Sequence, residues 1–293
     1  MIIVTGAQGF IGSTMISYLN SIGMTDIVAV DDFGIDHQKG YAYRADYTNL
    51  QDCRIQSIHP VCLSELDILP AGNIDVVFHF GAISNTLEKD VSKINYYNTE
   101  YTRILGQVCN KKSIPLIFSS TAAVYGNGDG PLNLYAESKL QSENDISGHA
   151  ACLRLFNVYG HREKHKGRMA SVIFKWQQEL QDTNSICLFE NSNKYMRDFV
   201  FVNDVCKIAN DILKVYKPGV YDLGSGHSRS FEEVADCLIK QNGLGIKKYI
   251  SMPNDLKSQY QENTKADMQG LLNLGIIPPM TSIEDGIKTY IGI

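Results

Sequence analysis

The sequence predicts an α/β protein in which a doubly wound parallel sheet is joined to a smaller mixed α/β lobe at the C-terminus. In the first half of the chain, short apolar runs alternate with longer segments of helical periodicity, and a glycine-rich turn follows the first run. This alternation is typical of buried parallel strands connected by helices. The runs expected to form strands are 2–4, 27–30, 76–80, 116–119 and 152–156.

The segments between and after these runs predict the helices and the lobe. Apolar residues recur at helical spacing between residues 11 and 22, and Gly23 is placed to end that helix. Beyond residue 157 the alternation loosens; helices are expected at 169–180, 204–214 and 231–241, and strands at 195–202 and from 221. We therefore expect residues 1–156 to form the large domain, with 197–222 returning to it, and residues 157–196 and 223–293 to form the smaller lobe.

The composition excludes several functional classes. The 293 residues carry a net charge of −5 and no basic stripe, so nucleic acid is not an expected partner. The seven cysteines are spread singly and the seven histidines lack metal-ligand spacing, which predicts reduced thiols in a cytoplasm and no metal site. No apolar run approaches the roughly 18 residues of a membrane span, and no charged leader precedes the first strand, so neither membrane insertion nor secretion is expected.

The glycine-rich turn predicts a bound dinucleotide. Gly6, Gly9 and Gly12 directly follow the first expected strand and open the first expected helix. Without a Cβ, this backbone can turn tightly and approach a pyrophosphate, whose charge then lies at the N-terminus of the helix. Phe10 and Ile11 of the same turn are expected to contact the cofactor. A glycine triplet alone would be weak evidence, because turns use glycine freely, but its place between strand and helix strengthens it.

The end of the next strand favours NAD over NADP. Asp31 can accept hydrogen bonds from the adenosine ribose hydroxyls. Asp32 adds a second negative charge that a 2′-phosphate would have to meet. Lys39, Arg44 and Arg54 are close enough in sequence to compensate, which keeps NADP as the alternative.

A second motif predicts proton transfer. Tyr135 and Lys139 are four residues apart, so on a helix they share one face. We expect the lysine ammonium to favour the phenolate, to lower the pKa of the tyrosine and to hold the cofactor's ribose. Thr121 ends an expected strand, where its hydroxyl can bond the reacting oxygen. The alternative is that Tyr135 and Lys139 are a chance pair on a solvated helix face. The order of the motifs, with the glycine turn first and the Ser119-Ser120-Thr121 strand end next, favours the functional interpretation.

Taken together, these motifs resemble those of the extended short-chain dehydrogenase/reductase family, the nucleotide-sugar epimerases and dehydratases, over nearly the whole chain. The resemblance implies a Rossmann-type fold and a nucleotide-sugar substrate. It also implies a diphosphate loop containing Gly81 and Ala82, an adenine-binding acid at Asp46, and a structural asparagine near the nicotinamide at Asn98. Arg197, in the run Arg197–Val202, resembles the family's arginine that binds the substrate diphosphate.

The run His161–Val172 is similar to the branch of this family that inverts C6 of ADP-glycero-manno-heptose. In that branch the lysine matching Lys166 and the tyrosine matching Tyr135 lie on opposite sides of the reacting carbon. Without the resemblance, Lys166 would be taken for a solvated charge in a basic loop. The resemblance further implies these substrate-binding residues: Ser84, Asn157, Arg168, Ser171, Phe189, Arg197 and Tyr260.

The residues after Thr121 discriminate between reactions. Ala122 and Ala123 stand where the dehydratases of the family need an acid pair, so elimination is disfavoured, and transient oxidation followed by re-reduction remains. The segment 127–134 is shorter than in typical members, which keeps a 4-epimerase or 4-reductase of another nucleotide sugar open. A cofactor-bound regulator without turnover is the third alternative, and the intact catalytic residues argue against it. A homo-oligomer is expected.

Overall fold

The computed structural model describes residues 1–31, 47–60, 73–253, 261–276 and 280–292, and its centre is a seven-stranded parallel sheet. The strand order is β10-β6-β5-β4-β1-β2-β3, which places the N-terminal strand inside the sheet. The strands are β1 (Ile2–Thr5), β2 (Ile27–Asp31), β3 (Ser57–Pro60), β4 (Val76–His79), β5 (Leu116–Thr121), β6 (Ala150–Leu155) and β10 (Gly219–Leu223). Because all pairings are parallel, the carboxyl ends of these strands meet at one edge.

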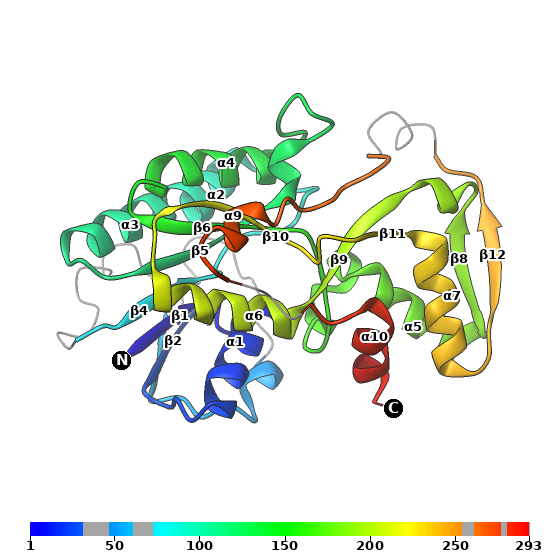
Figure 1. Ribbon diagram of the computed structural model, residues 1–293, viewed down its shortest axis with the longest axis horizontal. Helices are drawn as coiled ribbons and strands as arrows, with labels where there is room; N and C mark the ends of the chain where they lie inside the picture. The colour runs from blue at the N-terminus through cyan, green and yellow to red at the C-terminus, as the bar shows by residue number, and fades with distance from the viewer. Residues whose placement is uncertain (32–46, 61–72, 254–260, 277–279, 293) are drawn as a thin grey trace.

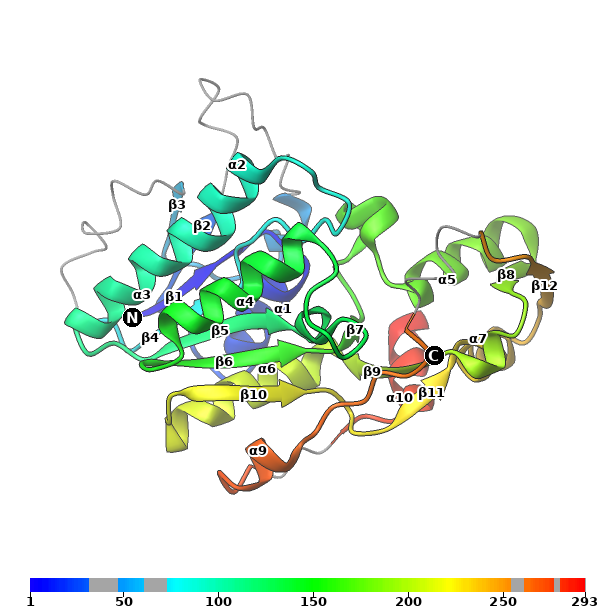
Figure 2. The ribbon, with the colours of Figure 1, turned by 90° about the horizontal axis from the view of Figure 1, so that it is seen from above.

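Helices cover both faces of this sheet, as a doubly wound fold requires (Figure 1). On one face α1 (Phe10–Ser21) packs against α6 (Val202–Asp211), and on the other α3 (Tyr101–Lys111) packs against α4 (Leu134–Ile146). Figure 2 shows α3 and α4 side by side along the sheet. Two short helical segments, α2 (Val91–Ile94) and η4 (Asn95–Glu100), lead into α3. Each face has its own apolar core.

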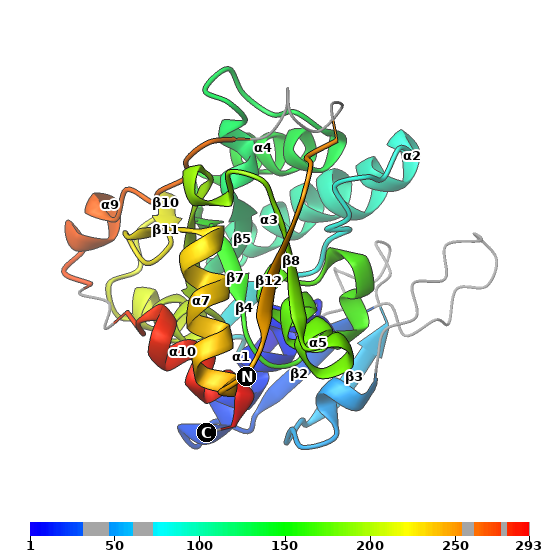
Figure 3. The same cartoon turned by 90° about the vertical axis from the view of Figure 1, so that its right-hand side faces the viewer.

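The smaller lobe lies at one end of the large sheet and faces the viewer in Figure 3. It contains two small sheets and the helices that pack on them. Strands β7 (Asn157–Tyr159), β9 (Met196–Phe201) and β11 (Ser228–Ser230) form a mixed sheet, and β8 (Ser185–Phe189) pairs in parallel with β12 (Ile246–Ile250). The helices α5 (Val172–Thr183), α7 (Phe231–Asn242) and α10 (Ile283–Ile291) enclose a third core. The short helix α9 (Gln269–Leu272) lies beside β10 of the large sheet.

The predicted fold class is confirmed. Each of the five strands predicted in residues 1–156 lies in the large sheet. The edge strand β3 was not predicted, because its sequence Ser-Ile-His-Pro has no apolar run. The helix expected at 169–180 begins instead at Val172, because the Ser171 hydroxyl caps it by accepting the Phe174 N–H at 3.1 Å. Of the segment 197–222 expected to return to the large domain, α6 and most of β10 lie with the large sheet, whereas β9 pairs within the lobe.

Within the described part of the chain, no helix combines the length and the apolar character needed to cross a membrane.

Candidate active site

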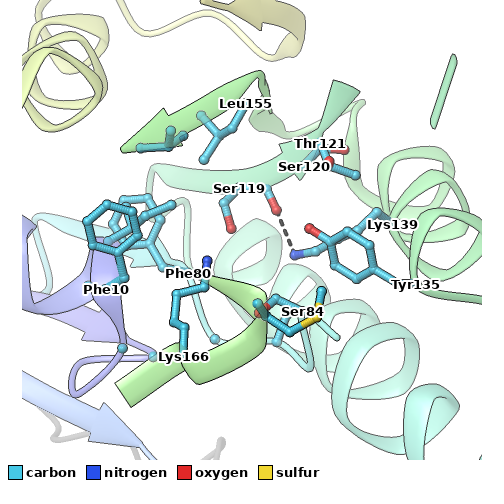
Figure 4. Close-up of a pocket in the computed structure, with 18 of the residues that line it drawn as sticks. Phe10, Phe80, Ser84, Ser119, Ser120, Thr121, Tyr135, Lys139, Leu155 and Lys166 are labelled. Atoms are coloured by element: carbon cyan, nitrogen blue, oxygen red, sulfur yellow. Dashed lines mark hydrogen bonds between the residues drawn. The ribbon is translucent and has the colours of Figure 1, made fainter. Parts of the chain in front are cut away.

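A cavity of about 320 Å³ opens at the carboxyl edge of the large sheet. Ligand sites of doubly wound sheets lie at this edge, outside the strand ends. Figure 4 shows that its walls come from the ends of β5 and β6, from α4 and from the segment carrying Lys166. The residues that line it are Gly6, Gln8–Gly12, Asp31, Phe80–Ala82, Ser84, Ser119–Thr121, Tyr135, Lys139, Leu155, Phe156, Val158, His165, Lys166 and Met169.

The glycine loop fits a dinucleotide for two reasons. Its tight packing needs glycine: a Cβ on Gly6, whose φ is +66°, would lie 2.6 Å from the Gly81 nitrogen, and one on Gly12 would lie 2.1 Å from the Gly6 oxygen. In addition, the N-terminus of α1 faces the cavity, and its N-cap, Gly9, has no side chain to cap the helix. The first-turn amides are therefore positioned to receive a phosphate, and the predicted residues Phe10 and Ile11 line the cavity beside them.

Asp31 stands where the sequence predicts it, and it has a neighbour that the sequence analysis missed. The Asp31 carboxylate accepts the Gln8 N–H at 2.7 Å and lines the cavity. The Gln8 side chain is fully buried, and neither of its amide atoms has a partner among the described residues. Arg54 lies away from the cavity, with its guanidinium bonded to the Asn20 oxygen at 3.0 Å. Three further predicted cofactor residues, Asp32, Lys39 and Asp46, lie outside the described residues.

The loop after β4 borders the cavity and is held in place by Asn98. Gly81, Ala82 and Ser84 line the cavity, as expected. Asn98 is buried and does not line it; its side-chain oxygen accepts the Ile83 N–H at 2.8 Å, and its amide donates to the Ile83 oxygen at 3.1 Å. The same amide donates to the Ser138 hydroxyl at 2.9 Å, which ties the loop to α4. Asn98 therefore fixes the loop against α4, and its expected place near the nicotinamide stays a prediction.

The predicted catalytic residues Thr121, Tyr135 and Lys139 all line the cavity. The Asn133 side chain caps α4 by accepting the Ala136 N–H at 3.0 Å, which starts the helix just before Tyr135. One turn later, Lys139 is 2% exposed, and its ammonium donates to the Ser119 oxygen at 2.7 Å. Figure 4 shows this bond beside the Tyr135 ring.

The expected direction of the Tyr135 pKa is wrong in this structure. Burial raises the pKa of Tyr135, and a hydrogen bond with Thr121 opposes that rise only in part. Burial also lowers the pKa of Lys139 to about 7, although Glu143 acts in the opposite sense. The physical reason is that Lys139 is buried and Tyr135 is partly buried, and loss of contact with water disfavours phenolate and ammonium alike.

A buried ionic network supports the strand end that carries Thr121, and sequence reasoning missed it. Glu143 on α4 is 2% exposed and accepts a short hydrogen bond from the Ser120 hydroxyl. Arg154 on β6 donates to the same carboxylate through two nitrogens, at 3.0 and 2.7 Å. Paired contacts of this kind fix orientation as well as charge. The Glu143 carboxylate therefore links β5, β6 and α4.

Lys166 lies on the short helical segment η6 (Lys164–Met169) and lines the same cavity as Tyr135. Figure 4 shows the two side chains on opposite sides of the cavity. The Lys166 ammonium lies 5.4 Å from the centre of the Phe10 ring. Burial lowers its pKa, Glu163 raises it and Lys175 lowers it further. Lys166 is therefore not a solvated surface charge, the alternative considered from the sequence, because it lines the cavity.

Five other predicted substrate residues, all within the described part of the chain, do not line this cavity. Asn157 and Arg168 are exposed, and the Ser171 hydroxyl is engaged with Glu163 and the cap of α5. Phe189 ends β8, where it pairs with Ile250. Arg197 is 8% exposed; its guanidinium donates to the Gln261 oxygen at 2.7 Å and lies 5.4 Å from the Phe231 ring. The last predicted residue, Tyr260, lies outside the described residues.

Comparison with known proteins agrees with this geometry. Residues 2–224 match the model of the NAD dependent epimerase/dehydratase family. An ADP-L-glycero-D-manno-heptose-6-epimerase of Brachyspira hyodysenteriae is 34% identical, over 99% of this chain and 96% of its own. The crystal structure of the Helicobacter pylori enzyme of the same name has a TM-score of 0.84 at 25% identity, covering 99% of this chain and 94% of its own.

A UDP-N-acetylglucosamine 4-epimerase from Methanobrevibacter ruminantium reaches the same TM-score, 0.84, at 21% identity, covering 99% of this chain and 96% of its own. At that identity the likeness shows only a shared fold. The family match and the curated relative go further, because they extend over most or all of the sequence. This chain belongs to the NAD-dependent epimerase/dehydratase family.

Proposed function

We propose that this protein inverts C6 of a nucleotide-activated heptose, ADP-glycero-manno-heptose, by transient oxidation to a ketone and re-reduction with tightly bound NAD. The observation that carries the proposal is the placement of two proton carriers, Tyr135 and Lys166, on opposite sides of one cavity (Figure 4). Inversion needs such a pair, because the reacting oxygen lies on different sides before and after the ketone turns. The 34% identical relative carries the name of this activity.

The cofactor would be held by the glycine loop, the first turn of α1 and Asp31. When bound, its nicotinamide supplies the site that accepts the hydride and returns it to the same carbon. The Asp31 carboxylate suits ribose hydroxyls as hydrogen-bond donors and repels a 2′-phosphate, so we propose NAD over NADP. Ser119–Thr121 and Lys139 border the same end of the cavity.

The proton transfers follow from the environment of each carrier. Burial raises the pKa of Tyr135, so the resting phenol is protonated and is suited to donate. Burial lowers the pKa of Lys166, which makes its neutral amine more accessible than that of an ordinary lysine and favours its role as acceptor of the hydroxyl proton. In the reverse direction the two roles exchange. Thr121 lines the cavity beside Tyr135, where its hydroxyl can bond the reacting oxygen through both steps.

Elimination chemistry lacks its acids in this cavity. Ala122 and Ala123, in the 3-10 segment η5 (Ala122–Tyr125), carry no titratable group. Among the described residues that line the cavity, Asp31 is the only carboxylic acid, and it lies at the cofactor end. A dehydratase needs one group to remove a proton and another to protonate the departing hydroxyl. The lining supports epimerisation better than dehydration.

Proton NMR of ADP-glycero-manno-heptose incubated with the protein tests the proposal, because the two C6 epimers give distinct spectra. We expect conversion to a mixture of both. Lys166→Ala should lower kcat by roughly 100-fold or more, the usual effect of a positioned acid-base. Lys164→Ala is the matched control, because Lys164 is an exposed lysine of the same segment and does not line the cavity.

Two results would count against this function. If Lys166→Ala keeps its kcat and only raises KM, Lys166 binds phosphate instead of moving a proton. If the heptose is unchanged while a hexose nucleotide is inverted at C4, the protein is a 4-epimerase, the alternative that the short 127–134 segment leaves open.

A further inference from the structure

The loop that carries Lys166 is closed at its base by a buried carboxylate. Glu163 is 1% exposed. Its Oε1 accepts the Gly160 N–H at 3.2 Å and the Ser171 hydroxyl at 2.8 Å, and its Oε2 accepts the Ser171 N–H at 2.5 Å. One side chain therefore joins the residue that follows β7 to the residue that caps α5.

The backbone between these two points needs such a tie. Arg162 has a φ of +74°, in the left-handed region that a non-glycine residue enters at a cost, and Gly167 has a φ of +51°. Both lie inside the loop, on either side of Lys166. Conformations of this kind persist only where the surrounding structure imposes them, and the Glu163 bonds fix the two ends of the loop.

Glu163 also acts on Lys166 through its charge. Glu163 forms no ion pair among the described residues. Burial raises the pKa of its carboxyl, and the donors named above and the more distant Lys166 offset that rise only in part. In return, the carboxylate opposes the lowering of the Lys166 pKa that burial causes. The backbone N–H of Lys166 donates to the backbone oxygen of Glu163 at 3.0 Å, which fixes the backbone of the two residues relative to each other.

We propose that Glu163 is a positioning residue for Lys166: it clamps the base of the loop so that the lysine reaches the cavity, and its negative charge acts on the lysine ammonium. This inference rests on the proposed function for the catalytic role of Lys166. An opposite charge held near an ammonium favours its protonated form, and a backbone fixed at both ends keeps the side chain within reach of a substrate.

Other titratable groups surround this pair and enter any pH profile. Lys175 on α5 acts on Lys166 in the opposite sense to Glu163. On α10, burial and the Glu163 charge both raise the pKa of Tyr290. The remaining charged or titratable groups of the loop are His161, Arg162, Lys164, His165 and Arg168.

The test substitutes Glu163→Gln, which keeps the size of the side chain and one acceptor oxygen but removes the charge. Glu179→Gln is the matched control, because Glu179 on α5 also accepts a backbone N–H, that of Cys187 at 2.9 Å, and does not act on Lys166. In Glu163→Gln we expect kcat to fall roughly tenfold while KM stays within about twofold, and the limb of the pH profile assigned to Lys166 to move to lower pH. The control should show neither change.

A readout that needs no turnover separates this inference from the proposed function. Reductive methylation with ¹³C-formaldehyde labels lysines without removing their charge, and the Lys166 signal is assigned by its loss in Lys166→Ala. The NMR titration of that signal should move down by roughly one pH unit in Glu163→Gln, as loss of an opposite charge requires. If the heptose assay fails but this shift appears, the proposed function is wrong and the effect of Glu163 on Lys166 stands.

Ser171→Ala covers the case in which Glu163→Gln does not fold. It removes the hydroxyl that donates to Glu163 while leaving both charges in place, so kcat should fall with little movement of the Lys166 titration. The proposal is overturned if Glu163→Gln folds with unchanged kcat and an unchanged Lys166 titration. It is equally overturned if Glu163→Gln does not fold and Ser171→Ala folds with the kcat of the unmodified protein.

Discussion

Acid should destabilise this protein through His79, a residue at the end of β4 in the middle of the large sheet. Its ring is fully buried, with Nδ1 2.6 Å from the Thr5 hydroxyl and Nε2 2.8 Å from the Thr102 hydroxyl. Burial, and next the nearby Lys139 charge, lower its pKa to about 3 from the ordinary 6.5. Between these two values the unfolded chain binds a proton that the folded protein does not.

The sign and the size follow from that difference. Histidine is charged when protonated, and the pKa of His79 is lower in the folded protein than in the unfolded chain. The folded protein therefore loses stability as the pH falls below the unfolded pKa. At about 1.36 kcal/mol per unit, the 1.5 units between 6.5 and pH 5 correspond to roughly 2 kcal/mol, and by pH 4 the loss is about 3 kcal/mol. For a chain of 293 residues, 2 kcal/mol is a drop of about 3 °C in the melting temperature.

Thermal unfolding from pH 7 to pH 4 measures this effect, with His79→Gln as the test variant and His59→Gln as the control on an exposed histidine. The variant can lose stability at pH 7, because its hydrogen bonds change, but it should lose much less on acidification than the unmodified protein. The His59 variant should keep the full acid loss. An unchanged acid loss in His79→Gln would refute the reasoning and assign the sensitivity to other groups.

Two further predictions concern the cavity. Asp31→Ala should weaken NAD binding more than NADP binding, because it removes ribose hydrogen bonds and a charge that repels the 2′-phosphate; fluorescence titration with both cofactors measures it, and tighter NADP binding by the unmodified protein would reverse our assignment. Tyr135→Phe should fold and keep its cofactor at a cost on the order of 1 kcal/mol, while turnover falls by roughly 100-fold or more. Turnover like that of the unmodified protein would remove Tyr135 from the mechanism.

Local sequence was sufficient for the features that depend on local spacing. The glycine triplet at Gly6, Gly9 and Gly12 predicted a strand–turn–helix unit, and β1 and α1 form it. The four-residue spacing of Tyr135 and Lys139 predicted a shared helix face, and both line one cavity. Spacing of this kind survives folding because the geometry of a helix or a tight turn is set by neighbouring residues.

Partners that are distant in sequence could not be predicted in this way. No sequence pattern predicts that Glu163 closes the loop of Lys166, or that the Gln8 side-chain amide is buried near Asp31. Arg197 and Ser171, which the sequence predicts at the substrate, form hydrogen bonds with Gln261 and Glu163 in the structure. Which polar groups face a cavity depends on how separate elements pack. A hydrogen bond between residues far apart in the sequence cannot be predicted from local composition.

The sequence by itself determined the fold class, the family and the motif of Tyr135 and Lys139 on one helix face. Only the tertiary structure decided the electrostatic state of that motif. The structure gives a rise in the Tyr135 pKa in place of the expected lowering, because the surrounding strands and helices reduce the contact of both groups with water. Desolvation depends on every atom that surrounds a charge, and most of those atoms come from residues far away along the chain.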